Sequence, residues 1–218
     1  MSTNTILNVN TISASALLAL AANTNKTINA SSVQILTGSV NEITNAFASD
    51  RIEGLDFKQV GEDIDGEADF DLSGRSISIS SNGSIVAIGA ARNDGNGDES
   101  GHVRIYQNIN NTWQQIGEDI DGEAAGDYSG SSVSLSNDGS TIAIGATGND
   151  GNGDRSGHVR IFQNNNNTWQ QIGDDIDGER FDDESGYSIS LSSDGSIVAV
   201  GSRYNDKNLW ENWRGHVR

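Results

Sequence analysis

The sequence is dominated by one segment that occurs three times, and each copy begins 56 residues after the one before. Phe57, Trp113 and Trp169 begin the three copies. Short motifs recur inside the copies: DIDGE at 63–67, 119–123 and 175–179, Ser-Gly at 73–74, 129–130 and 185–186, and GHVR at 101–104, 157–160 and 215–218. Because a fixed period of this length is typical of a tandem array of one structural unit, the repeat sets the architecture.

Each copy predicts four short β-strands separated by turn residues. In the central copy we expect them at Ser132–Ser136, Thr141–Ala146, Gly157–Gln163 and Trp169–Gly173. The first and third alternate apolar with polar residues, and the second is almost continuously apolar, which is typical of a strand covered on both faces. The fourth would be anchored by Trp169 and Ile172.

Turn chemistry and small residues suggest how these strands assemble. Asn137-Asp138-Gly139 predicts a type I′ hairpin turn, in which both central residues need positive φ. Ala143, Gly145 and Ala146 favour 141–146 as an inner strand, where blades crowd the axis. We therefore expect a mainly β fold, a partial β-propeller built from tandem four-stranded antiparallel blades, because one blade cannot bury both of its faces alone. A flat β-solenoid is the alternative.

Residues 1–56 lack the repeat and predict a small α/β module of βαβα-like order. Strands are expected at 5–10 and 26–30, and helices at 13–22 and 39–49. Ser13 or Ser15 would cap the first helix, and Ser39 with Glu42 would form a capping box on the second. The pieces ISASALLAL, TINASSVQILTGSVNEITNAFAS and IEGL resemble a Thr/Ala/Ser-rich repeat of large cyanobacterial and other bacterial surface or exported proteins.

The expected organisation is thus an N-terminal module at 1–56 and propeller-type repeats at 57–218, divided as 57–112, 113–168 and a shortened 169–218. Residues 57–61 match the fourth strand of the unit and would serve as a closing piece. The chain stops inside the third GHVR strand, which leaves an unpaired edge. We therefore expect a fragment of a longer parent chain that supplies the remaining blades, with closure through an oligomer as the alternative.

Composition narrows the range of partners. The chain has 218 residues, 26 glycines, no proline and no cysteine, which excludes disulfides, thiolate metal sites and a cysteine nucleophile. Its net charge of −18 excludes nucleic acid and anionic membrane surfaces as natural partners. Cations, basic proteins and neutral glycans remain, or the charge serves solubility alone. Membrane insertion is not expected, and Ala16–Ala22 lacks the basic leader of a cleavable signal.

Residues 57–218 resemble the FG-GAP-like repeats of bacterial surface proteins, which are distantly related to the integrin α-subunit propeller. Ser129-Gly130 stands where the family has Phe-Gly, Ile144–Thr147 stands for Gly-Ala-Pro, and Gly157–Phe162 stands for the closing Gly-x-Val-x-Val-Tyr strand. The family's calcium loop is reduced here to 137–139, so that site does not carry over. The resemblance implies a non-enzymatic module for adhesion or protein–protein contact, located extracellularly or on a bacterial cell surface.

One glycine-rich loop could still bind Ca²⁺. Oxygen ligands at alternate positions of a flexible loop suit a hard cation. The candidates are Asp94, Asn96 and Asp98 in the first copy and Asp150, Asn152 and Asp154 in the second. The alternative is a connection chosen for its turn geometry. The third copy has lost the last acid of this run.

A second set of acids, which we call the acidic ladder, lies between successive blades. It comprises Asp63, Asp65, Glu67, Asp119, Asp121, Glu123, Asp175, Asp177 and Glu179. Its presence in every copy favours a role in blade-to-blade geometry over cation binding, and Asp127 would cap the following Ser-Gly turn. His102, His158 and His216 repeat in the same way, which favours packing or hydrogen bonding over catalysis. Trp113 and Trp169 are expected at the core or blade interface rather than in a sugar-stacking platform.

These observations together predict a non-enzymatic interaction module whose ligand is a protein or a glycan at a cell surface. The Ser-His-Asp arrangement of a hydrolase would need a unique, unrepeated set of residues, and the sequence displays none. A carbohydrate-binding or carbohydrate-active propeller is the alternative. An enzyme of that kind would need two carboxylates in one pocket.

Overall fold

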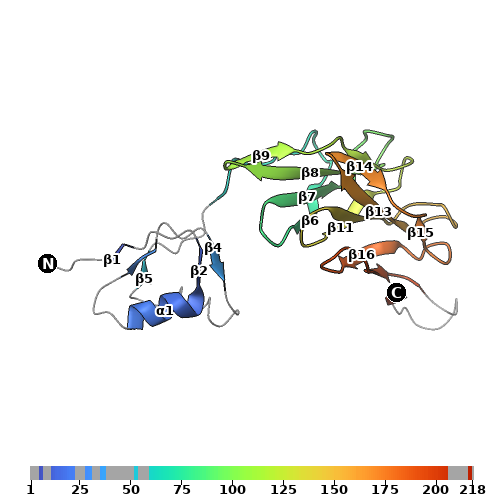
Figure 1. Cartoon of the computed structure of the whole chain (residues 1–218). Coiled ribbons are helices and arrows are strands. Elements are labelled where there is room, and N and C mark those ends of the chain that lie inside the picture. Colours follow the sequence, from blue (N-terminus) through green and yellow to red (C-terminus); the bar gives the residue numbers. More distant parts are fainter. Residues whose placement is uncertain are drawn as a thin grey trace. The chain divides into compact units, whose positions relative to one another are not determined.

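The computed structural model describes residues 5–6, 11–22, 28–30, 35–37, 52–53, 59–205 and 216–217. It divides the chain into two compact units, Met1–Gln59 and Val60–Arg218 (Figure 1). Among the described residues, no helix is long and apolar enough to cross a membrane.

The first unit combines one helix with two small parallel sheets. Strands β1 (Thr5–Ile6), β3 (Ile28–Asn29) and β5 (Ile52–Glu53) form one sheet, and β2 (Thr11–Ser13) and β4 (Ile35–Thr37) form the other. Helix α1 (Ala14–Ala22) follows β2, and its N-cap is Ser13, whose Oγ accepts a hydrogen bond from the amide of Ala16. The helix predicted at 39–49 lies outside the described residues.

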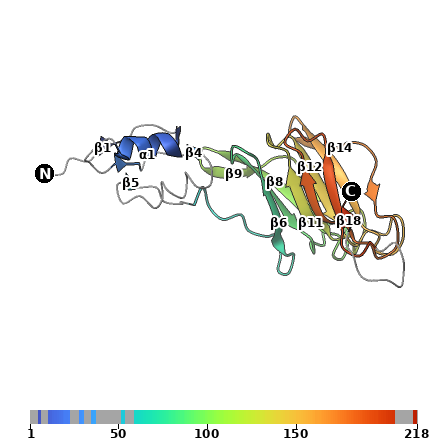
Figure 2. The same ribbon diagram turned by 90° about the horizontal axis from the view of Figure 1, so that it is seen from below.

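The second unit is mainly β and antiparallel, as predicted, and consists of three similar sheets in chain order (Figures 1 and 2). We call these sheets blades 1, 2 and 3. Blade 1 contains β6 (Ser73–Ile79), β7 (Ile85–Ala90), β8 (His102–Ile109), β9 (Thr112–Gln115) and β10 (Ile120–Asp121). Blade 2 contains β11 (Ser129–Leu135), β12 (Thr141–Ala146), β13 (His158–Asn165), β14 (Thr168–Gln171) and β15 (Ile176–Asp177). Blade 3 contains β16 (Ser185–Leu191), β17 (Val198–Ser202) and β18 (His216–Val217).

In blades 1 and 2 the outer strand is split into two pieces, which the sequence did not predict. In blade 1, β9 pairs with the second half of β8, and β10 pairs with its first half. The chain leaves the strand at Gly117, whose φ is +78°. The middle of the acidic ladder is therefore a strand, and Asp121 lies opposite His102 in the β10–β8 register.

The turn between the first two strands of a blade is not type I′. Gly139 has a φ of +73°, but Asn137 and Asp138 do not have positive φ. The amide of Gly139 donates to the carbonyl of Ser136 at 3.0 Å, which is typical of a type I turn followed by a left-handed glycine. The Asp138 carboxylate favours this geometry, because it accepts hydrogen bonds from Ser136 and Ser140.

Apolar side chains from neighbouring blades form the core. The cluster between blades 1 and 2 contains Ala87, Val103 and Ile105 from blade 1, and Val133 and Leu135 from β11. A second cluster joins blades 2 and 3 through Ala143, Val159 and Val200. The face of β11 that carries Val133 and Leu135 is buried, whereas the equivalent face of β6 is exposed, with Ile79 60% accessible.

The small residues of 141–146 lie where neighbouring blades approach closely. Strand β12 is an interior strand of its sheet, between β11 and β13. A Cβ on Gly145 would meet the backbone of Gly186, so glycine here permits the close approach of blade 3. Gly89 has the same relation to Gly130.

Of the two tryptophans predicted at the core or blade interface, Trp169 packs there, whereas Trp113 Nε1 donates to the carbonyl of Val60 in an exposed contact. Trp169 lies against the cluster between blades 1 and 2, and its Nε1 donates to the carbonyl of Ile116. Ile172, however, is 42% exposed and does not anchor its strand as predicted. The strand expected at 57–61 is also wrong where the structure describes it, since 59–61 are not in a strand. Phe57 lies outside the described residues.

Candidate functional site

The glycine-rich loops use part of their polar atoms to hold their own shape. In the first loop, Asp94 Oδ1 accepts a hydrogen bond from the amide of Glu99 at 2.8 Å. Asn96 Nδ2 donates to the carbonyl of Gly122, which joins the loop to the chain segment entering blade 2. Asp150 and Asn152 make the equivalent contacts in the second loop. The structure thus brings each set into one loop, and calcium binding by Asp94, Asn96 and Asp98 and their copies stays a prediction.

Backbone carbonyls of the acidic ladder accept hydrogen bonds from arginines of the blades. Arg104 Nη2 donates to the carbonyl of Asp65 at 2.7 Å, and Arg160 Nη2 donates to the carbonyl of Asp121 at 2.6 Å. Both arginines come from the GHVR strands, so each joins its blade to the chain segment that precedes it. Asp127 does not cap the following Ser-Gly turn as predicted. Its Oδ2 accepts hydrogen bonds from the amides of Glu123 and Ala124 in the turn before it.

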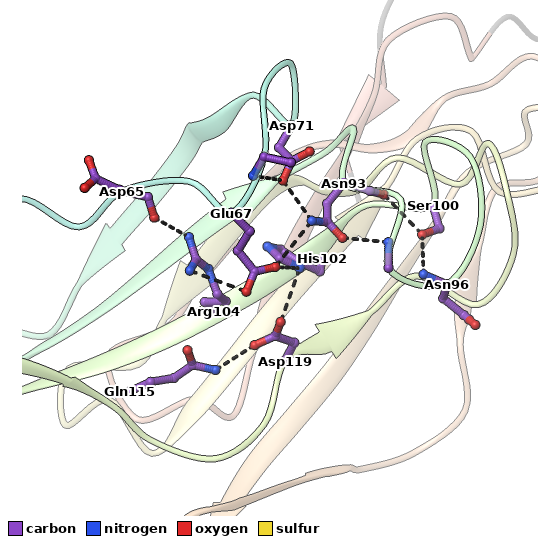
Figure 3. Close-up of polar contacts among 12 residues, drawn as sticks. Asp65, Glu67, Asp71, Asn93, Asn96, Ser100, His102, Arg104, Gln115 and Asp119 are labelled. Carbon is purple, nitrogen blue, oxygen red and sulfur yellow. Dashed lines mark hydrogen bonds and ion pairs between the residues drawn. The ribbon is translucent and has the colours of Figure 1, made fainter.

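Carboxylates of the ladder meet the repeated histidines in two equivalent clusters. In the first cluster, His102 Nδ1 lies 3.5 Å from Asp119 Oδ2 and 3.8 Å from Glu67 Oε2 (Figure 3). The second cluster consists of Glu123, His158 and Asp175, with Nδ1 distances of 4.0 Å to Glu123 and 3.6 Å to Asp175. Each cluster draws its two acids from successive copies of the repeat, and its histidine from the GHVR strand between them.

Burial controls the charge of the second histidine. His158 is 1% exposed, and this burial lowers its pKa because the charged imidazolium loses solvation. Arg160 lowers the pKa of His158 further, while Asp175 and Glu123 oppose the shift. The imidazole of His158 is therefore neutral at pH 7.

A groove with a volume of about 710 Å³ crosses the same unit, and it is lined by residues from all three repeats. Since equivalent residues of a tandem array can be compared directly, the chain itself shows which groove positions vary. Asp150 is an acid in all three copies and Asp154 in two of them, and every other lining residue lies at a position where the copies differ. The diverged residues are Leu72, Tyr128 and Glu184; Arg75, Ser131 and Tyr187; Ala91, Thr147 and Arg203; Arg92 and Gly148; and Ala125, Gly126 and Arg155.

The groove is polar and contains a network of ion pairs. Glu184, which is 5% exposed, forms ion pairs with Arg155 and Arg203. The guanidinium of Arg203 lies 5.0 Å from the ring centroid of Tyr187, within the range of a cation–π contact. The Tyr128 hydroxyl donates to Glu99 Oε2 at 2.6 Å, and this hydrogen bond raises the pKa of Tyr128.

Several groove residues have positive φ, a backbone conformation that glycine adopts more easily than other residues. Leu72, Tyr128 and Glu184 occupy one repeat position and have φ values of +55°, +54° and +48°. Arg155 also has a positive φ, of +52°. Bulky residues are rare in this region, because Cβ crowds the backbone there. Because the positive φ recurs at one position in all three copies, it belongs to the repeated backbone geometry, and only the side chains displayed there differ between copies.

The sequence contained a signal for the groove that the prediction did not use. The repeated motifs drew attention to positions that are the same in every copy, whereas the groove is built from the positions that differ. Leu72, Tyr128 and Glu184 occupy the same position in the three copies, and their difference in residue type is a sequence signal for one side of the groove. Nothing in the sequence pattern, by contrast, indicated that Glu67 and Asp119 would meet at one histidine.

The tandem antiparallel blades, packed through their faces, define a propeller-like fold. Residues 120–162 match the family model of the FG-GAP repeat, which confirms the FG-GAP-like resemblance. An FG-GAP repeat is in general a non-enzymatic module associated with surface interactions.

No curated protein matches the chain. Among solved structures, the chain is similar to a protein from Bacteroides uniformis provisionally assigned as a 6-phosphogluconolactonase, with 17% identity and a TM-score of 0.39. That match covers 59% of this chain and 33% of the other, so the chain spans about a third of that protein's length.

Proposed function

We propose that this chain is a non-enzymatic interaction module of a bacterial surface or exported protein, and that it holds a protein or glycan ligand in the groove across its blades. The observation that carries this proposal is the gathering of diverged positions in one groove. Residues that recur in every copy serve the folding and packing of each blade. A ligand, in contrast, contacts all three blades at once, so each blade can contribute a different side chain.

Two of the three acids that line the groove are held by groups of the protein itself, which favours binding over hydrolysis. Glu184 is engaged by two arginines, and Asp150 accepts a hydrogen bond from the amide of Arg155. Arg75 is exposed and has no acid partner among the described residues. A ligand with an anionic group would therefore find a cation available at Arg75 and aromatic faces at Tyr128 and Tyr187.

Exchanging groove residues between copies tests the proposal. The triple variant Arg75→Ser, Arg92→Gly and Tyr187→Ser replaces three exposed side chains with residues that another copy carries at the same position. Because these backbone positions already accept the new residues, stability should change by less than about 1 kcal/mol. We expect the labelled wild-type chain to bind a panel of bacterial cells saturably, and the variant to lose at least tenfold in affinity.

The matched control exchanges two exposed positions outside the groove, Ser81→Asn and Ile109→Asn, which also copy residues of the second repeat. It should bind like the wild type. Treating the cells with protease or with periodate would identify the ligand as protein or glycan. Equal binding by the triple variant and the control, or no saturable binding by the wild type to any cell, would contradict the proposal.

We also propose that the glycine-rich loops bind Ca²⁺ and stabilise the module. At a calcium concentration one hundred times Kd, each site would add about 2.7 kcal/mol by mass action. For a chain of this size that is a rise of several °C in Tm between EDTA and excess CaCl₂. The variant Asp94→Asn with Asp150→Asn should lose the rise. Glu118→Gln with Asp174→Asn removes two exposed acids elsewhere and should keep it. An unchanged Tm in the wild type would refute the calcium site.

A further inference from the structure

The carboxylates in both histidine–carboxylate clusters are held so that one oxygen of each faces the histidine. In the first cluster, Gln115 Nε2 donates to Asp119 Oδ1 at 2.6 Å, which leaves Oδ2 directed at His102. Arg104 Nη1 lies 3.8 Å from Glu67 Oε1, while Oε2 faces the imidazole and is also 3.5 Å from Asn93 Nδ2. Figure 3 shows both acids directed at the same ring nitrogen of His102.

The second cluster repeats this arrangement with its own residues. Gln171 Nε2 donates to Asp175 Oδ1 at 2.6 Å, and Arg160 Nη1 lies 3.7 Å from Glu123 Oε1. The other oxygen of each carboxylate faces His158 Nδ1. Partners that fix the orientation of an acid through its outer oxygen are the usual support of a metal ligand.

The histidines themselves are buried polar groups that lack a hydrogen bond. His102 and His158 are each 1% exposed, and the Nε2 atom of each has no partner among the described residues. On the opposite side of each ring, Nδ1 faces two carboxylate oxygens at 3.5–4.0 Å, longer than the usual N–H···O bond. The acid oxygens lie near Nδ1 without a normal hydrogen bond to it, which leaves room for an ion between the imidazole and the two carboxylates.

We propose that each cluster is a binding site for a first-row divalent transition-metal ion of the Zn²⁺ class, held by His Nδ1 and one oxygen from each acid. Zn²⁺ binds imidazole nitrogen and carboxylate oxygen at about 2.0–2.2 Å, which places tetrahedral ligand atoms about 3.4 Å apart. The three ligand atoms of each cluster lie within 4.8 Å of one another, so small side-chain movements bring them to that spacing.

The ligand atoms determine the class of metal, and the exposure of the two acid side chains keeps the site accessible. A neutral imidazole with carboxylates suits Zn²⁺ and its neighbours, whereas Ca²⁺ and Mg²⁺ take oxygen ligands. The side chains of Glu67 and Asp119 are 46% and 28% accessible, so an ion can enter from solvent and keep a water ligand. Because its acids come from successive repeats, the ion would tie the segments that enter neighbouring blades to one strand. The sites share no ligand residue with the glycine-rich loops or with the groove lining, although Asn96 Nδ2 of the first loop donates to the backbone carbonyl of Glu123.

Calorimetric titration of the tag-free, EDTA-stripped chain with Zn²⁺ tests the proposal. We expect His102→Ala and His158→Ala each to remove one bound equivalent. Glu67→Gln and Glu123→Gln keep the size of exposed side chains and should weaken their own site alone, which protects the test if a histidine variant does not fold. Gln115→Leu should weaken the first site by about 10- to 100-fold while leaving the stoichiometry unchanged. Circular dichroism checks that each variant is folded.

Two controls distinguish Zn²⁺ binding at these clusters from Zn²⁺ binding at other acidic residues. Asp94→Asn with Asp150→Asn alters the glycine-rich loops and should leave Zn²⁺ binding unchanged. Co²⁺ in place of Zn²⁺ should give visible absorption that is lost in the double variant Glu67→Gln with Glu123→Gln. Zn²⁺ uptake equal to the wild type in that double variant, or no uptake by the wild type at micromolar Zn²⁺, would overturn the proposal. Neither result bears on ligand binding in the groove.

Discussion

Leu135→Ala is expected to lower the free energy of unfolding by about 2–5 kcal/mol, the usual cost of removing a buried leucine side chain. Leu135 is 7% exposed and belongs to the apolar cluster between blades 1 and 2. Its equivalent in the first copy, Ile79, is 60% exposed. Ile79→Ala should therefore cost less than about 1 kcal/mol, because it removes little buried area and leaves no cavity. Urea denaturation of the two variants measures the difference.

The two residues occupy equivalent positions in β6 and β11, next to the same kind of turn. The main difference between the two variants is therefore the burial of one face. A large cost for Ile79→Ala would mean that the exposed face of β6 is covered in solution. Repeating that measurement at several protein concentrations would show whether a second copy covers it.

Gly145→Ala is expected to destabilise the protein by about 1–3 kcal/mol, the typical cost of forcing extra atoms into a packed interface. A Cβ on Gly145 would lie 3.0 Å from the carbonyl carbon of Gly186 and closer still to its oxygen. Blades 2 and 3 would have to separate, and the hydrogen bond from Ser132 Oγ to the Gly186 carbonyl, 2.6 Å long, would be strained. The fall in Tm against the wild type measures this cost.

The third copy provides the matched control. A Cβ on Gly201 would meet the Ser188 hydroxyl, which can rotate away, while the nearest backbone atom, Ser188 O, is 3.4 Å distant. Gly201→Ala should therefore change stability by well under 1 kcal/mol. Neither glycine has positive φ, so backbone strain does not confuse the comparison. If both variants were equally stable, the close approach of blades through glycine would be wrong.

Local sequence signals predicted the elements of a blade well. The β-strand at 141–146, the alternation in 132–136 and the glycine turn between them depend on contacts a few residues apart, and each was found close to its expected position. The turn type was missed because the Asp138 carboxylate accepts hydrogen bonds from serines on both sides, which propensity for Asn-Asp-Gly alone does not reveal. Strand β10 was missed because it has only two residues.

The acidic ladder shows the limit of repeat-based reasoning. Its recurrence predicted a role between blades, and the hydrogen bonds from Arg104 and Arg160 to its carbonyls are contacts of that kind. Its side chains, however, also converge on the buried histidines. Glu67 and Asp119 are 52 residues apart in the chain, and they meet because His102 lies on the strand between the segments that carry them.

The repeated unit, its antiparallel β-strands, its turn positions and the FG-GAP-like resemblance can all be predicted from the sequence, because periodicity and turn chemistry act over short distances. Which residues of different copies come together depends on the packing of the blades. Stacking of the blades places Tyr128 and Glu184 in one groove, covers Leu135 while leaving Ile79 exposed, and sets two acids beside each buried histidine. Those juxtapositions depend on how one blade packs against the next, which no local pattern records.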